Sequence, residues 1–60
     1  MYSVKIITTD KEINLENLSE QDTINILKNV YNSVERLSEY IKFTEDIKIF
    51  ALDLDSFYIC

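Results

Sequence analysis

The segment Asp53-Leu54-Asp55-Ser56 contains the side chains that are best spaced to do chemistry in this sequence of 60 residues. In an extended strand, two residues of rise would place both carboxylates on one face about 7 Å apart, where they could hold a divalent cation or face a basic partner. A calcium loop begins in this way, but it needs a glycine at its sharp turn, and the sequence has none. Because the ligand set is so incomplete, we interpret the segment as a solvated turn between two strands.

The residue types on which most enzymes rely are missing. The sequence has no histidine, which excludes a Ser–His or Cys–His pair, and no glycine, which excludes the usual phosphate-binding loops. Two carboxylates could still act as acid and base, but such a site needs a cleft that excludes water, and 60 residues leave little volume for one. We therefore expect no catalytic activity, no metal site and no cofactor.

The only cysteine, Cys60, cannot form a disulfide within the chain, and without histidine there is no set of zinc ligands. A domain of this size buries only about 60% of the surface that its unfolded chain exposes, so we expect a second copy or a target to support the fold. The lone thiol and the absence of an apolar N-terminal signal predict a cytoplasmic protein. No apolar run approaches the roughly 20 residues that span a bilayer.

Eleven acidic residues against six basic ones give the protein a formal net charge of −5. This sign disfavours direct binding to nucleic acid, where Lys and Arg replace the counterions of the phosphates, and it gives no reason to expect membrane binding. It could steer the protein toward the basic surface of another protein, such as the face with which an enzyme binds DNA or RNA. A modest negative charge also keeps a small protein soluble, so both interpretations stay open.

Apolar residues at every second position predict a β-hairpin, with one strand over 2–9 and a shorter one around Ile13 and Leu15. The sequence has neither glycine nor proline, so we expect any positive backbone φ to fall on Asn or Asp, which tolerate it best among the other residues. The candidates at the predicted junctions are Asp10, Asn17 and Asp46.

Residues from Ser19 onward have the pattern of an amphipathic helix. Ser19 is a suitable N-cap, and acidic residues follow it in the first turn, where they complement the helix dipole. Apolar residues then recur at spacings of three and four, which predicts one long helix from Ser19 to near Lys42, with a break near Ser38 as the alternative. The apolar stripe, which we expect to be core, comprises Ile24, Leu27, Val30, Tyr31, Val34, Leu37 and Ile41.

The last third of the chain, residues 44–60, fits two descriptions. Segments 47–52 and 57–60 are rich in β-forming residues, whereas a helix capped by Thr44 would also align several apolar positions. We favour strands, because a helix would leave further apolar residues exposed. The sequence thus predicts an α+β fold in a single domain over 1–60. We expect a small antiparallel β-sheet in the order β-β-α-β, with a fourth strand as an option, packed on one long amphipathic helix.

Apolar and aromatic residues outnumber what one helix-covered sheet face can hide, so we expect a partner to cover some of them. This surplus predicts a homodimer or a tight complex with another protein. Several acidic residues that follow the helix are not explained by helix capping, and they could imitate a row of phosphates. The residues that we expect to bind a protein partner with a basic surface are Glu45, Asp46, Asp53, Asp55, Phe57 and Tyr58.

In size, acidic charge and predicted element order, the chain is similar to small bacteriophage inhibitors of host enzymes, such as uracil-DNA glycosylase inhibitors and anti-CRISPR proteins. The resemblance includes no diagnostic residue, so it assigns no functional position. It implies a phage or mobile-element protein that evades host defence by blocking an enzyme that handles nucleic acid, as a DNA mimic does. The alternative is a self-assembling structural subunit. A third and weaker reading is metal-dependent catalysis at Asp53 and Asp55.

Overall fold

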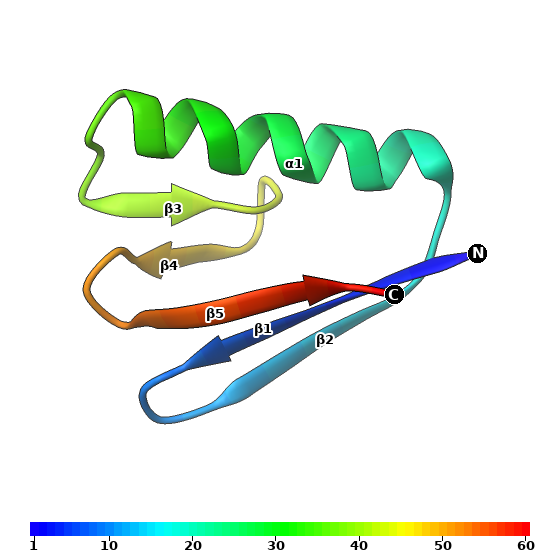
Figure 1. Ribbon diagram of the computed structural model, residues 1–60, viewed down its shortest axis with the longest axis horizontal. Helices are drawn as coiled ribbons and strands as arrows, with labels where there is room; N and C mark the ends of the chain where they lie inside the picture. The colour runs from blue at the N-terminus through cyan, green and yellow to red at the C-terminus, as the bar shows by residue number, and fades with distance from the viewer.

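The computed structural model describes residues 1–60 (Figure 1). The elements are β1 (Tyr2–Thr8), β2 (Glu12–Leu18), α1 (Glu20–Glu35), β3 (Tyr40–Lys42), β4 (Lys48–Phe50) and β5 (Leu54–Ile59). The strands form an antiparallel three-stranded sheet of order β2-β1-β5 and a separate antiparallel pair of β3 and β4. The predicted α+β fold, a small antiparallel sheet packed on one amphipathic helix, is confirmed. The last third of the chain forms strands, but β3 and β4 pair outside the main sheet.

β1 is the central strand of the three-stranded sheet, and its alternation decides which face becomes the core. Val4 and Ile6 are 1% and 0% exposed. They lie opposite Leu15 and Ile13 of β2, so apolar side chains of both strands share the face that α1 covers. The hairpin predicted from the alternating pattern is therefore confirmed, with a second strand that is longer than expected.

α1 begins at the predicted N-cap. Ser19 Oγ accepts a hydrogen bond from the Asp22 backbone N–H at 3.1 Å, and the Asp22 carboxylate accepts one from the Ser19 N–H at 3.2 Å. This reciprocal capping box satisfies two donors that a helix start leaves free. At 16 residues, α1 is too short and too polar to cross a membrane.

α1 ends at Glu35, so the prediction that it continues to near Lys42 is wrong. Leu37 adopts a φ of 55°, its N–H donates to the Val34 carbonyl, and the Ser38 N–H donates to the Ser33 carbonyl at 3.0 Å. These bonds form a Schellman motif, which usually has glycine at the position of Leu37. The apolar periodicity of the sequence continues past the end of α1, because the apolar residue Leu37 occupies the position that usually holds glycine.

Two residues have positive φ, Asn17 at 58° and Leu37 at 55°. Asn17 was one of three predicted candidates, and it lies at a bulge in β2 where the pairing with β1 shifts register. The expectations for Asp10 and Asp46 are wrong, because the turns at these residues close without a left-handed backbone. Leu37 was not expected, since its type disfavours the left-handed region.

The core is not built on the helix stripe that the sequence predicted. The buried residues of α1 are Thr23, Ile26, Val30 and Ser33. Of the predicted stripe only Val30 and Ile41 are buried, and Ile41 belongs to β3. The two hydroxyls face the core without loss of hydrogen bonds, because Thr23 Oγ1 donates to the Ser19 carbonyl at 3.0 Å and Ser33 Oγ to the Asn29 carbonyl at 2.9 Å.

The end of α1 yields a stability prediction. Replacing Leu37 with glycine should raise the free energy of unfolding by about 1 kcal/mol, because the left-handed backbone strains a residue that has a Cβ. Leu37 is 90% exposed, so little packing is lost. Chemical denaturation measures the change. Leu37→Ala is the control, since it removes the same exposed side chain but keeps the Cβ. Equal stability of the glycine and alanine variants would contradict the explanation.

Candidate protein-binding surface

α1 carries a second apolar stripe that the fold does not use. Tyr31 and Val34 are 67% and 57% exposed, and Leu27 and Ile24 are 41% and 37% exposed. The four residues follow one another at spacings of three, four and three, so they line one side of the helix. Large side chains that are exposed together in this way mark interaction surfaces more often than isolated exposed residues do.

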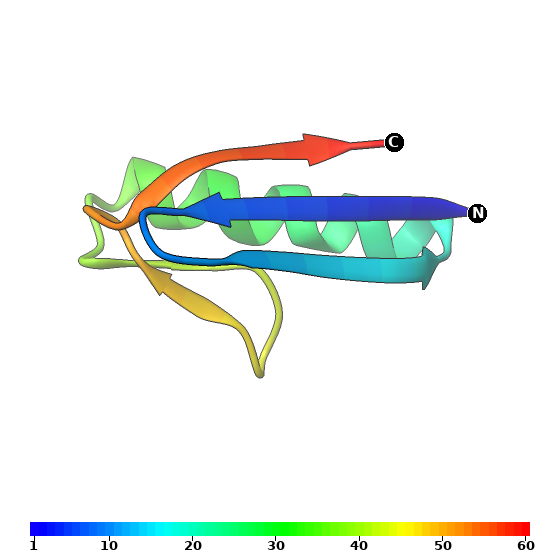
Figure 2. The ribbon, with the colours of Figure 1, turned by 90° about the horizontal axis from the view of Figure 1, so that it is seen from below.

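The other side of α1 is tied to β3 and the loop that follows it. Asn29 Nδ2 donates to the Phe43 carbonyl at 3.2 Å, and Ser33 Oγ accepts from the Lys42 N–H at 3.1 Å. A helix turns about 100° per residue, so Leu27 and Tyr31, each two residues from Asn29, point away from β3. In Figure 2 the β3–β4 hairpin lies at one margin of the molecule and β5 at the other. The exposed stripe therefore projects on the β5 side.

β5 is an open edge of the three-stranded sheet, because only β1 pairs with it. Ser3 and Cys60 exchange both backbone hydrogen bonds, at 3.2 and 2.9 Å. In an antiparallel pair such residues alternate with residues whose N–H and C=O groups point outward. By this alternation the backbone groups of Phe57 and Ile59 point away from β1, toward the free edge.

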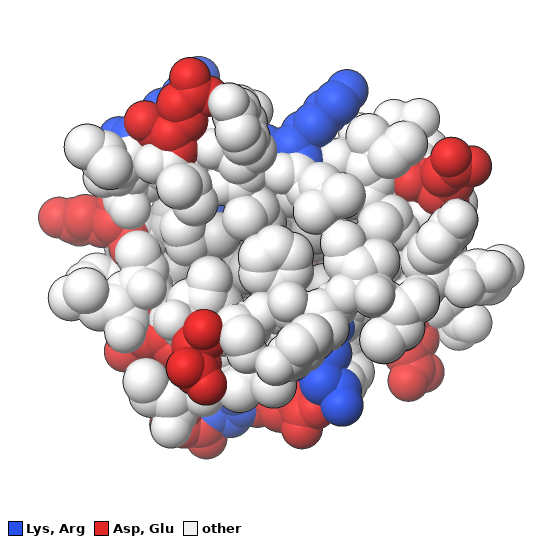
Figure 3. Space-filling view, in the orientation of Figure 1, with Lys and Arg blue, Asp and Glu red and all other residues white.

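The apolar side of α1 and the edge of β5 together form one largely apolar surface, and Lys28 lines the same hollow as Ile24, Leu27 and Tyr31. We call this surface the α1–β5 face and define it by Ile24, Leu27, Tyr31 and Val34 of α1 and by Phe57 and Ile59 of β5. Figure 3 views this side of the molecule and shows uncharged atoms across its centre, with most charged side chains around the rim. Ile59 lies opposite the buried Val4 and is itself 38% exposed, so its side chain faces the same layer as α1.

The structure places the predicted acidic residues in two separate groups. Glu45 and Asp46 lie in the turn between β3 and β4, whereas Asp53 and Asp55 lie at the opposite end of β4, where the chain enters β5. Asp53 precedes β5, and Asp55 lies at an irregularity in the pairing of β5 with β1. No three acidic or cysteine side chains gather in a way that could hold a metal ion.

The two predicted aromatic residues lie on opposite faces of β5. Phe57 faces the core, where its ring makes an edge-to-face contact with Phe43, with centroids 5.6 Å apart. Tyr58 lies opposite Lys5 on the outer face of the sheet and is 53% exposed. The sequence prediction names these two residues of β5 as contact residues and no residue of α1, because it assigns the exposed stripe of α1 to the core.

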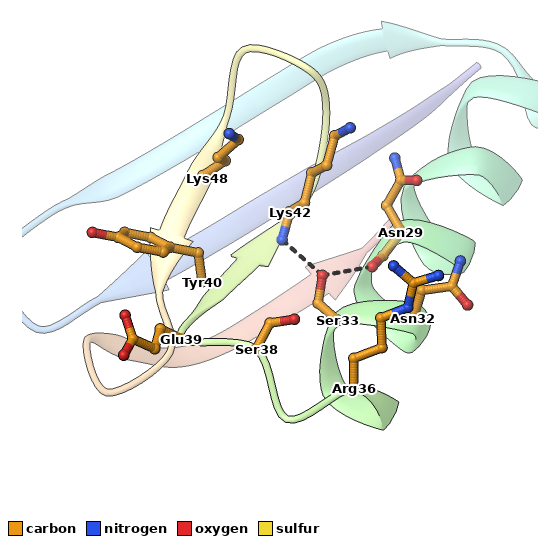
Figure 4. Close-up of a pocket in the computed structure, with 9 residues that line it drawn as sticks. All are labelled: Asn29, Asn32, Ser33, Arg36, Ser38, Glu39, Tyr40, Lys42 and Lys48. Carbon is orange, nitrogen blue, oxygen red and sulfur yellow. Dashed lines mark hydrogen bonds between the residues drawn. The ribbon is translucent and has the colours of Figure 1, made fainter.

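A polar groove of about 440 Å³ lies between α1 and the β3–β4 hairpin (Figure 4). Half of the six basic residues of the chain, Arg36, Lys42 and Lys48, line it together with Asn29, Asn32 and Tyr40. Lys42 and Lys48 are directly opposite each other in the β3–β4 pair, and neither has an ion-pair partner. Two like charges at opposed positions destabilise a hairpin. The groove is open, and most of the residues that line it are polar or charged.

No family model, no curated protein and no solved structure matches this chain. The interpretation of its surfaces therefore depends on their geometry alone.

The lysine pair yields a second stability prediction. Lys48→Glu should raise the free energy of unfolding by about 0.5 kcal/mol at low salt, because it turns a repulsive cross-strand pair into an attractive one. Lys48→Gln removes the repulsion without adding attraction and should lie in between. Thermal unfolding at two salt concentrations measures both changes, and the difference should shrink as salt screens the charges. A Lys48→Glu variant less stable than the parent would contradict this account.

Proposed function

We propose that the protein acts by binding another protein through the α1–β5 face, without catalysis. The exposed stripe of α1 is the observation that supports this proposal. Tyr31 and Val34 are more than half exposed and Leu27 is 41% exposed, although the same helix buries Thr23 and Ser33 on its other side. A helix that buries small polar residues and exposes large apolar ones is best explained by a second contact surface.

The energetics of the face suit a protein partner. Removing apolar surface from water stabilises a contact by roughly 25 cal/mol per Å², so full burial of a leucine side chain contributes about 2 kcal/mol. Tyr31 adds an aromatic ring with a hydroxyl group, the combination that is enriched at the centres of interfaces. The uncharged centre and the charged rim match the usual arrangement of a protein–protein interface.

A second candidate function uses the acidic residues instead. The structure has one ion pair, between Lys5 and Glu12 at 3.1 Å, so the carboxylates of Glu45, Asp46, Asp53 and Asp55 have no cationic partner within the chain. Such residues could be held against the basic face of a nucleic-acid-handling enzyme, as an inhibitor that imitates DNA would hold them. The wide separation of the two acidic groups favours the α1–β5 face as the main contact.

A pull-down with tagged protein tests the proposal. The bait proteins are the parent, Leu27→Lys, which puts a charge into the centre of the α1–β5 face, and Asn25→Lys. Asn25→Lys is the matched control, because it adds the same charge two residues away on the opposite side of α1. We expect the parent and the control to retain one protein at constant stoichiometry, and Leu27→Lys to lose it. Equal retention by all three would contradict binding through this face.

Salt separates the two candidate functions. A contact through the α1–β5 face should persist as salt rises, because burial of apolar surface is not screened. A contact through the acidic residues should weaken steeply with salt and should be lost when Glu45, Asp46, Asp53 and Asp55 are changed together to their amides. Binding that resists salt and tolerates the four amides would exclude the acidic mode.

A further inference from the structure

We propose that the partner on the α1–β5 face is a second copy of this chain, with β5 of the two copies paired antiparallel about a two-fold axis. The inference rests on the proposed function, since it names the occupant of the same face. Pairing of the two edges would join two sheets of order β2-β1-β5 into one continuous sheet. A two-fold interface of this kind needs a surface that is complementary to itself, and an uncharged strand edge meets that condition.

The backbone of β5 sets the register. The outward N–H and C=O groups belong to Phe57 and Ile59, so Phe57 of one copy can exchange two hydrogen bonds with Ile59 of the other. The two-fold axis then passes at Tyr58, and symmetry doubles the bonds to four. Moving the axis to Phe57 would instead bring Asp55 opposite Ile59 and draw a carboxylate into the contact, which costs desolvation. The register about Tyr58 keeps Asp53 and Asp55 outside the paired residues.

The side chains along β5 agree with this register. Phe57 and Ile59 face the layer of α1, so Phe57 of each copy would lie beside Ile59 of the other across the new strand pair. Tyr58 would lie directly opposite the Tyr58 of the second copy on the outer face of the sheet. An aromatic pair at opposed positions is among the contacts that stabilise antiparallel strands. This arrangement would cover a residue that is 53% exposed in one copy.

The helices would also meet. Figure 2 shows α1 behind β1, and the two β1 strands of such a dimer lie three strand spacings apart, or about 14 Å. An α-helix with its side chains is about 10–12 Å across, so two helices at this separation touch through large side chains. Leu27, Tyr31 and Ile24 are large residues, and they project from the side of α1 that would face the second copy.

The distribution of charge favours a second copy as occupant. Two chains with a net charge of −5 repel each other, so a stable contact must exclude the acidic residues. The segment from Ser56 to Cys60 has no charged residue and no proline. Proline and charged residues, lysine above all, are what usually protect a strand edge from pairing. A standard interface buries about 800 Å² of accessible surface on each partner, which is less than a fifth of the 4454 Å² surface of this chain.

Sedimentation of the purified protein over a range of micromolar concentrations tests the inference. The parent and Asn25→Lys should form a dimer, and Leu27→Lys should raise the dissociation constant at least about 30-fold, as loss of an interface anchor does. Leu27→Lys also makes the net charge less negative, so general repulsion cannot explain its effect. A parent that stays monomeric would overturn the inference.

Amide hydrogen exchange provides a readout specific to β5 pairing. The Phe57 and Ile59 amides should exchange slowly in the concentrated parent and quickly in Leu27→Lys, whereas the Tyr58 amide, which faces β1, should stay protected in both. Fast exchange at Phe57 and Ile59 in a proven dimer would show that another surface joins the copies, which contradicts the inference. A monomeric parent that captures a different protein, with loss in Leu27→Lys, would overturn the dimer and leave the proposed function intact.

Discussion

Phe43 contacts α1, β5 and the turn between β3 and β4, through its ring and through its backbone groups. Phe43 is fully buried, and its ring contacts that of Phe57 in β5. Its carbonyl accepts from Asn29 of α1, and its N–H donates to the Ile47 carbonyl across the turn between β3 and β4. The hydrogen bond of Asn29 to this carbonyl favours the rotation of α1 in which its larger apolar stripe stays exposed.

This constraint explains why the helix buries small residues. Ser33 and Thr23 occupy positions where α1 approaches the rest of the fold, and their hydroxyls bond to the helix itself. Ser33 also accepts from the Lys42 N–H, which holds β3 beside α1. A larger residue in place of Ser33 would push α1 away from β3 and break the bond between Ser33 and Lys42. The exposed face is thus a consequence of the packing between α1 and β3.

The sequence was sufficient to predict the elements whose patterns have one interpretation. The alternation in β1 and the cap at Ser19 each predict one structure, and both are confirmed. The helix face was mispredicted because α1 has two apolar stripes, and the spacing of apolar residues by itself favours the one with more members. The number of apolar residues in α1 indicates the second stripe, since those at 24, 26, 27, 30, 31 and 34 exceed what one stripe can hold.

The candidate site was predicted in part, for a related reason. Phe57 and Tyr58, which both lie in β5, are predicted contact residues because apolar and aromatic residues outnumber what one helix-covered sheet face can hide. The contribution of α1 could not be read from the sequence, because it depends on the bonds of Ser33 to Lys42 of β3 and of Asn29 to Phe43 just after β3, which span 9 and 14 residues. Contacts at that separation leave no periodic signal.

The charged rim around the open edge of β5 and the exposed stripe of α1 restricts the contacts that both can make. An unprotected edge strand in an acidic protein is partly shielded from indiscriminate pairing, because each approaching copy brings the same charged rim. Only an approach that aligns the uncharged centres avoids this repulsion, and that approach also brings the two stripes of α1 together. In the proposed dimer, negative charge around an apolar face would therefore select the geometry of association, while apolar burial would supply its stability. In a chain of 60 residues, whose own core is small, the same burial would also stabilise the fold.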